Sequence, residues 1–218
     1  MPLTVFTNAR LLDPASGRDE VGTVVTEGGK IAALGAGVTA PEGAQVVDCT
    51  GLCLAPGLVD MRVAVGEPGE EQRETILSAS RAAAAGGITA FAMLPNTKPV
   101  IDDIAGLEFI ARRAREAKLV KIFAYGAVTH GTQGKELAEM GLLAEAGAVG
   151  FTDGIHAIGD ALTMRRALSY AKAFDKVIVQ HPEEPSLAAG GQMNEGEIST
   201  RLGLSGTRTV LDGLSPDP

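Results

Sequence analysis

After Pro56 the sequence alternates between short apolar runs and segments with helical spacing, and this alternation restricts the fold more than any other feature. Five apolar runs follow one another, at residues 58–65, 88–94, 120–128, 148–153 and 176–181. Segments with apolar residues at helical spacing lie between them, at 73–87, 103–118, 135–147 and 159–174. Such alternation is typical of a parallel sheet with crossover helices, and runs this apolar are typical of strands covered on both faces. A doubly wound sheet and a (β/α)₈ barrel both fit the pattern.

The first 55 residues follow a different pattern, with short β-rich stretches bounded by Gly, Asn, Asp and Pro. The stretch TEGGKIAAL, residues 26–34, predicts a hairpin. We therefore expect two domains, a small β domain over residues 1–55 and an α/β domain over residues 56–218. Near the end, GEISTRLGLSG predicts a short helix, whereas TRTVLDGLSPDP predicts no clear element.

Composition and charge exclude several classes of function. Hydrophobic residues make up 45% of the chain, enough for a sizeable core, and the net charge of -8 argues against a nucleic-acid or anionic-membrane surface. No apolar run is long enough to predict a membrane span, and the N-terminus lacks the pattern of a signal peptide. The sequence predicts a cytoplasmic protein.

Candidate functional side chains follow three of the apolar runs. In a barrel the active site lies at the carboxyl ends of the strands, and Asn96, Asp153 and His181 all occupy such ends. An Asp and a His from neighbouring strands can hold a metal ion together. Hydrogen-bonded structural residues are the alternative interpretation.

Several motifs together resemble those of the dihydroorotases of the amidohydrolase superfamily. They are PGLVDMRVAVGEPG, MLPNTKP, FTDG, QHPEE and the long MNEGEISTRLGL run, in this order along nearly the whole chain. The resemblance implies a fold of an N-terminal β-sandwich portion followed by a (β/α)₈ TIM barrel. Only about five of eight strands are present, so the barrel would be incomplete and would expose an apolar strand edge. Hydantoinase-like relatives carry a bridging carboxylated lysine on the fourth strand, and AVGFTDG contains none.

The metal site implied by this resemblance is altered. The family pattern has histidines at the positions of Arg62 and Ala64, which face the same way on one strand, and a substrate-carboxylate arginine at the position of Gly66. Arginine offers no lone pair and alanine has no donor atom. Asp153 and His181 match the remaining metal ligands, and Asn96 matches a substrate-binding asparagine. No cofactor is therefore expected, with zinc as the expectation if the protein is active.

Three functions remain open. The resemblance favours a non-catalytic dihydroorotase-like protein that is a structural partner of the aspartate carbamoyltransferase catalytic chain, or forms a homo-oligomer. The alternatives are an active metal-dependent cyclic amidohydrolase that hydrolyses dihydroorotate, and a non-functional fragment. In the non-catalytic protein we expect Arg62 to replace the metal by pairing with Asp153 or Asp60. Glu183 and Glu184 are candidates to orient His181, or are simply exposed.

Overall fold

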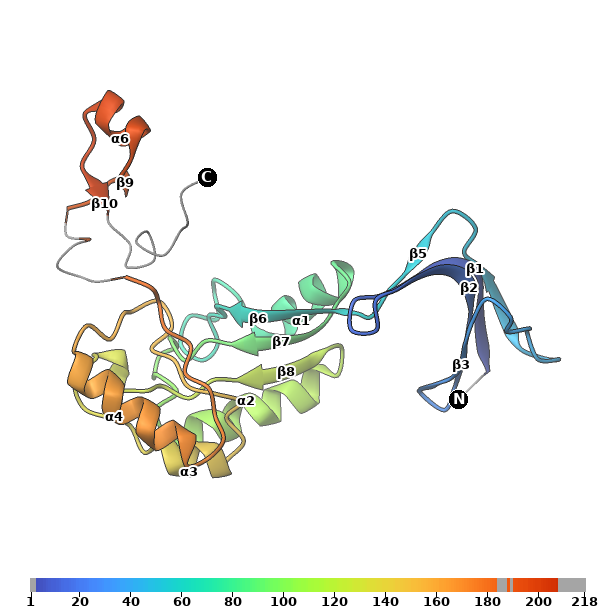
Figure 1. Ribbon diagram of the computed structural model, residues 1–218. Coiled ribbons are helices and arrows are strands. Elements are labelled where there is room, and N and C mark those ends of the chain that lie inside the picture. Colours follow the sequence, from blue (N-terminus) through green and yellow to red (C-terminus); the bar gives the residue numbers. More distant parts are fainter. Residues whose placement is uncertain (1–2, 184–187, 189, 208–218) are drawn as a thin grey trace. The chain divides into compact units, whose positions relative to one another are not determined.

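The computed structural model describes residues 3–183, 188 and 190–207, which form two compact units (Figure 1). The first unit ends at Gly57 and the second begins at Leu58. In the described part of the chain, no sheet contains strands from both units. No helix among the described residues is long and apolar enough to cross a membrane.

The first unit is a single five-stranded sheet. Its order is β3-β2-β1-β4, with β5 also paired to β1. The bounds are β1 (Thr4–Asp13), β2 (Arg18–Glu27), β3 (Lys30–Gly35), β4 (Gln45–Asp48) and β5 (Cys53–Leu54). The predicted hairpin is confirmed between β2 and β3. Gly28 and Gly29 form its turn with φ values of 58° and 79°, the backbone that a two-residue hairpin favours and that glycine adopts most readily.

One sheet is not a sandwich, so the described residues of this unit supply only a single layer. A groove of about 330 Å³ runs over the sheet, lined chiefly by apolar side chains that include Phe6, Leu11, Val24, Leu34 and Leu54. These residues come from β1, β2, β3 and β5. Phe6 and Leu11 are five residues apart, and the irregularity of β1 between Phe6 and Ala9 allows both to line the groove.

The second unit is built on parallel strands. The order is β6-β7-β8, with bounds β6 (Leu58–Val63), β7 (Ile88–Met93) and β8 (Lys121–Ala124). The fourth and fifth apolar runs continue this arrangement through single parallel bridges, from Gly126 to Phe151 and from Phe151 to Ile178. The described residues thus place the five runs side by side in sequence order, although only three of them form extended strands.

Most of the predicted helices are present, with capped beginnings. They are α1 (Ile76–Ala85), α2 (Ile104–Ala117), α3 (Met140–Glu145) and α4 (Ala161–Lys172), and a 3₁₀ turn η1 covers His130–Thr132. Thr75, Asp103 and Asp160 accept a hydrogen bond from the backbone N–H three residues on, which satisfies a free donor at the start of α1, α2 and α4. Helices α1 and α2 pack against β7 and β8.

The helix expected over residues 135–147 is shorter than predicted. The backbone before α3 is instead bonded to the segment after β8: the N–H of His130 donates to the carbonyl of Glu136, and the N–H of Ala138 donates to the carbonyl of Val128. These residues cannot use the same groups in a helix, so α3 begins only at Met140.

The short helix predicted near the end is confirmed as α6 (Glu197–Leu202), which lies between β9 (Met193–Asn194) and β10 (Gly206–Thr207). The two short strands pair in parallel, with Met193 opposite Gly206. Residues 208–218, which include most of the stretch predicted to lack a clear element, lie outside the described residues.

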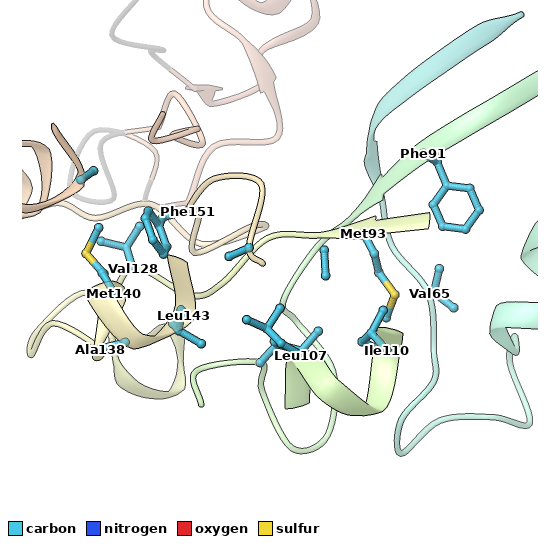
Figure 2. Packing of buried hydrophobic residues seen from close by; sticks show 14 of the residues in the cluster. Val65, Phe91, Met93, Leu107, Ile110, Val128, Ala138, Met140, Leu143 and Phe151 are labelled. Atoms are coloured by element: carbon cyan, nitrogen blue, oxygen red, sulfur yellow. The ribbon is translucent and has the colours of Figure 1, made fainter. Parts of the chain in front are cut away.

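The core of the second unit is aliphatic, with two phenylalanines. Figure 2 shows side chains from the strands meeting those of α2 and α3, among them Met93, Leu107, Ile110, Leu143 and Phe151. Each of these five is at most 4% exposed. This core holds the carboxyl ends of the strands in place.

Strand β6 has a free edge, because among the described residues it pairs only with β7. Leu58, Val59 and Met61 are 61%, 64% and 71% exposed. An open strand edge with apolar side chains is a template for association. The exposed apolar edge expected from the sequence is thus found on the first strand.

Candidate active site

The carboxyl ends of the parallel strands surround a cavity of about 720 Å³. Its lining includes Ala64 and Gly66 from the end of the first apolar run, Asn96 and Lys98 after β7, and Ile155 and His156 after the fourth run. The cavity therefore lies where a barrel fold positions functional residues. Ala64 has only a methyl group and Gly66 has no side chain, so neither residue can reach a ligand in the cavity.

Asp153 is buried and both of its carboxylate oxygens accept hydrogen bonds. Oδ1 accepts from the N–H groups of Val128 and Thr129, at 2.9 and 3.0 Å, and Oδ2 accepts from the Thr129 hydroxyl at 2.5 Å. The residue is 1% exposed, and this burial raises the pKa of Asp153 although the three hydrogen bonds lower it. The carboxylate ties the fourth run to the segment after β8.

Asn96 uses its side-chain amide to hold the turn that follows Asp153. Its Nδ2 donates to the carbonyl of Asp153 at 3.1 Å, and its Oδ1 accepts from the N–H of Ile155 at 3.2 Å. One N–H of the amide remains for another acceptor. The structure thus brings Asn96 and Asp153 together at the cavity, and substrate binding by Asn96 remains a prediction.

Replacing Gly154 with alanine should lower the free energy of unfolding by about 3 kcal/mol. Gly154 has a φ of 66°, where a Cβ costs about 1–2 kcal/mol, and that Cβ would also collide with Oδ1 of Asn96. Gly87→Ala is the matched control, because Gly87 has a φ of 76° and open space around its Cβ position. Urea unfolding measures the stability of both variants. Equal losses of stability would show that the contact between a Cβ at position 154 and Asn96 adds nothing to the cost of the φ angle.

Arg62 does not form the ion pair that the sequence analysis predicts. Its Nη2 donates to the backbone carbonyl of Gly154 at 3.3 Å, and neither Asp153 nor Asp60 pairs with its guanidinium. The Asp153 oxygens are buried and already bonded, and Oδ1 of Asp60 accepts from the backbone N–H of Arg62. The direction of the side chain was predicted correctly, because Gly154 adjoins Asp153, but the partner was wrong.

Gly66 lies in a turn that leaves no room for a side chain. The N–H of Glu70 donates to the carbonyl of Gly66 at 2.6 Å. A Cβ on Gly66 would collide with the carbonyl oxygen of Glu70 and would lie 3.0 Å from that of Glu74. The turn is therefore built for glycine, and an arginine here would require a different backbone.

His181 lies at the end of the fifth run, and it is half-buried. Its Nε2 lies 3.7 Å from Oε2 of Glu183, so the predicted orienting role of Glu183 is compatible with the geometry. Glu184 lies outside the described residues.

The side chains around Asp153 do not fit the ligand set of a catalytic zinc site. Such a site needs about three protein ligands, and the described part of the chain contains no group of three or more His, Cys, Asp or Glu side chains arranged to hold a metal. The Asp153 oxygens instead accept hydrogen bonds from protein N–H and O–H groups. The assignment of Asp153 and His181 as ligand positions therefore rests on the sequence pattern alone.

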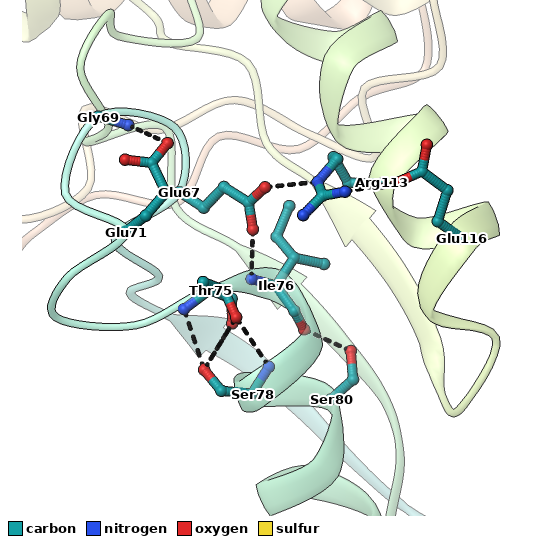
Figure 3. A network of polar contacts seen from close by, with 9 residues as sticks. All are labelled: Glu67, Gly69, Glu71, Thr75, Ile76, Ser78, Ser80, Arg113 and Glu116. Atoms are coloured by element: carbon teal, nitrogen blue, oxygen red, sulfur yellow. Dashed lines mark hydrogen bonds and ion pairs between the residues drawn. The ribbon is translucent and has the colours of Figure 1, made fainter.

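A polar network beside the cavity was not anticipated from the sequence. Glu67 is 3% exposed, its Oε2 accepts from the N–H of Ile76 at 2.7 Å, and its Oε1 accepts from Nε of Arg113 at 2.5 Å (Figure 3). Arg113 also pairs with Glu116. Glu67 thus joins the turn after β6 to the start of α1 and to α2. No local spacing links residues 67 and 113, so no sequence pattern predicts this contact.

The fold places the chain among amidohydrolase-fold proteins. It resembles an L-hydantoinase (dihydropyrimidinase) from Arthrobacter aurescens with a TM-score of 0.71, over 86% of this chain and 42% of that one. It also resembles the crystal structure of a dihydroorotase with a TM-score of 0.56, over 84% and 52% of the two chains. Their sequences are 24% and 15% identical to this one, so these likenesses concern the fold.

Sequence comparison defines the family more closely. The dihydro-orotase-like family model matches residues 51–213. A dihydroorotase from Pelobacter propionicus is 46% identical over 95% of this chain and 49% of its own length. One from Geobacter sulfurreducens is 47% identical over 90% and 46%. The chain belongs to the dihydroorotase-like family, as the motifs predict, and spans about half the length of these curated relatives.

Proposed function

We propose that this chain is a non-catalytic dihydroorotase-like protein of pyrimidine synthesis. The observation that carries the proposal is the pair Arg62 and Ala64, which stands where the family pattern has two metal-binding histidines. A permanently charged guanidinium cannot ligate a cation and repels one. The turn at Gly66 supports the same conclusion, since it excludes the substrate-binding arginine of the family.

The proposed architecture is a partial one. The first unit would be one layer of a β-sandwich, and the second would be the first five strands of a (β/α)₈ barrel with their helices. The support is the side-by-side order of the five apolar runs and the resemblance to amidohydrolase-fold proteins. The free edge of β6 is where such a barrel would close against its last strand.

The proposed partner is the catalytic chain of aspartate carbamoyltransferase, in the cytoplasm. The support is the family resemblance, in which members without metal ligands act as structural partners. Co-expression followed by size-exclusion chromatography tests the proposal, with a shared peak as the expected result. Elution of this chain as a homo-oligomer apart from the carbamoyltransferase would contradict it.

An active cyclic amidohydrolase is the second candidate function. The observation in its favour is that relatives 44–47% identical over this segment are named dihydroorotases. Such an enzyme would need metal-activated water, and its ligands would have to come from an arrangement other than residues 62 and 64.

Metal analysis and an activity assay distinguish these two functions. The purified protein, expressed with added zinc, should contain far less than one zinc per chain and should not hydrolyse dihydroorotate. The double variant Arg62→His, Ala64→His should also remain inactive, because the turn at Gly66 still excludes the carboxylate-binding arginine. About one zinc per chain together with turnover would support the amidohydrolase instead.

A further inference from the structure

We infer that the outward face of α2 binds the same face of a second copy of this chain, with the two helices antiparallel. Four exposed residues define this face, at spacings of three or four along the helix: Ala105, Glu108, Arg112 and Arg115. The buried side chains of α2, Leu107 and Ile110, belong to the core. The outward face is therefore free to contact another molecule.

The charges along α2 change sign near Ile110. The acidic residues Asp102, Asp103 and Glu108 precede this point, and the basic residues Arg112, Arg115 and Lys118 follow it. A two-fold axis level with Ile110 would place the acidic part of one helix against the basic part of the other. In that arrangement Glu108 lies opposite the partner's Arg112, and this contact occurs twice in each dimer.

Glu108 and Arg112 are both available for such a contact. Among the described residues, the ion pairs of α2 join Arg113 to Glu67 and to Glu116, and neither Glu108 nor Arg112 takes part in one. The two residues are four apart, a spacing that allows an ion pair within the helix. The guanidinium of Arg112 instead lies over the ring of Phe109, at 5.4 Å from its centroid.

The surface beside these charges is hollowed and partly apolar. A groove of about 630 Å³ is lined by residues that include Ala105 and Phe109 of α2 and Ala146 at the end of α3. A cavity of about 330 Å³ adjoins it at Ala105, and its lining includes the exposed side chains Ile104 and Leu142. Side chains of a second helix can pack into such grooves, and burial of the apolar side chains would favour association.

A second copy fits this face better than an unrelated partner does. Any partner needs charges complementary to Glu108 and Arg112, but the change of sign about one point makes the face complementary to itself, as a two-fold interface requires. Arg115 and Lys118 lie farther from the axis, at the rim, where charges affect mainly the association rate. The inference goes beyond the proposed function and does not depend on the loss of the metal site.

Sedimentation velocity of the 218-residue chain over a range of concentrations tests the inference. Salt at about 0.15 M screens the repulsion between chains of net charge -8. We expect an equilibrium between monomer and dimer. Glu108→Arg and Arg112→Glu each place like charges opposite one another, so each variant should dimerise tenfold or more weakly than wild type.

An equimolar mixture of the two variants is the decisive sample. One chain then has arginine at both positions and the other has glutamate at both, so both contacts of the mixed dimer join opposite charges. The mixture should associate within about threefold of the wild-type affinity. Arg81→Glu is the control, because it makes the same change of charge at an exposed residue of α1 with no ion pair among the described residues, and it should dimerise like wild type. Circular dichroism verifies that each variant is folded.

Three results would overturn the inference. They are a wild-type chain that stays monomeric up to about 100 μM, charge-reversal variants that dimerise as tightly as wild type, and folded variants that do not associate when mixed. The second result would assign the dimer to another surface, such as the free edge of β6. The carbamoyltransferase is absent from these samples, and a dimer that also shares its peak satisfies both proposals, so the two can fail separately.

Discussion

An Arg113→Met substitution is expected to lower the free energy of unfolding by about 3 kcal/mol. It leaves the carboxylate of Glu67, 3% exposed, with only the N–H of Ile76 as a partner. Removing one partner of a buried ion pair typically costs about 3–5 kcal/mol, and the 35% exposure of the Arg113 side chain places this pair at the lower end. Urea unfolding monitored by circular dichroism measures the loss.

Arg115→Met is the control for this prediction. Arg115 is exposed on the same helix and forms no ion pair among the described residues, so its replacement should change stability by less than about 0.5 kcal/mol. A double variant with Glu67→Gln should regain part of the loss, because it removes the uncompensated charge. Equal effects of Arg113→Met and Arg115→Met would show that the pair with Glu67 contributes nothing to stability.

An Asp153→Ala substitution should lower the free energy of unfolding by about 3–5 kcal/mol. It leaves the N–H groups of Val128 and Thr129 and the hydroxyl of Thr129 buried without an acceptor, and each such group costs about 1–3 kcal/mol. The loss should be seen in metal-free buffer with chelator, because it comes from hydrogen bonds within the protein. A variant as stable as wild type under these conditions would contradict the structural role.

Asp153→Asn is the matched variant, and it should lower the free energy of unfolding by less than about 1 kcal/mol at neutral pH. Its amide oxygen can still accept from both N–H groups, and its NH₂ can donate to the Thr129 hydroxyl. Burial raises the pKa of Asp153, so the folded state holds this proton more tightly than the unfolded state does. The resulting stabilisation is present at acid pH and is lost as pH rises through the raised value. The Asp153→Asn variant has no carboxyl group at this position, so the free energy of unfolding should lose this part of its pH dependence.

Local patterns were sufficient to predict much of the fold. The alternation after Pro56 predicts five strands, of which three form extended strands and the other two runs join the sheet only through single parallel bridges. Helix α2 (Ile104–Ala117) lies within the predicted segment 103–118 because its cap, Asp103, and its apolar spacing are local features. The prediction over residues 135–147 was too long, because residues 136–138 bond to the segment 128–130, a pairing that the spacing of apolar residues does not encode.

The candidate site could be predicted only in part. Asn96 and Asp153 were correctly placed together, since the carboxyl ends of neighbouring parallel strands must meet at one edge of a sheet. The partner of Arg62 was wrong, because the hydrogen bonds that bury Asp153 come from backbone N–H groups, and every residue type supplies those. The contact between Glu67 and Arg113 was missed for a related reason: it depends on how the turn after β6 meets α2.

The turn at Gly66 bears on how this branch of the family could change in evolution. An ancestor with an arginine at this position must have had a different backbone between residues 66 and 70, because the carbonyl of Glu70 now fills the space beside the Gly66 alpha carbon. Histidines at 62 and 64 could return by single substitutions. An arginine at 66 could not return until the turn had opened, and each intermediate with a clash would be less stable than its parent. In the proposed non-catalytic protein, the turn at Gly66 would make the loss of a substrate-binding arginine hard to reverse, because restoring the arginine requires a change of the backbone as well as of the side chain.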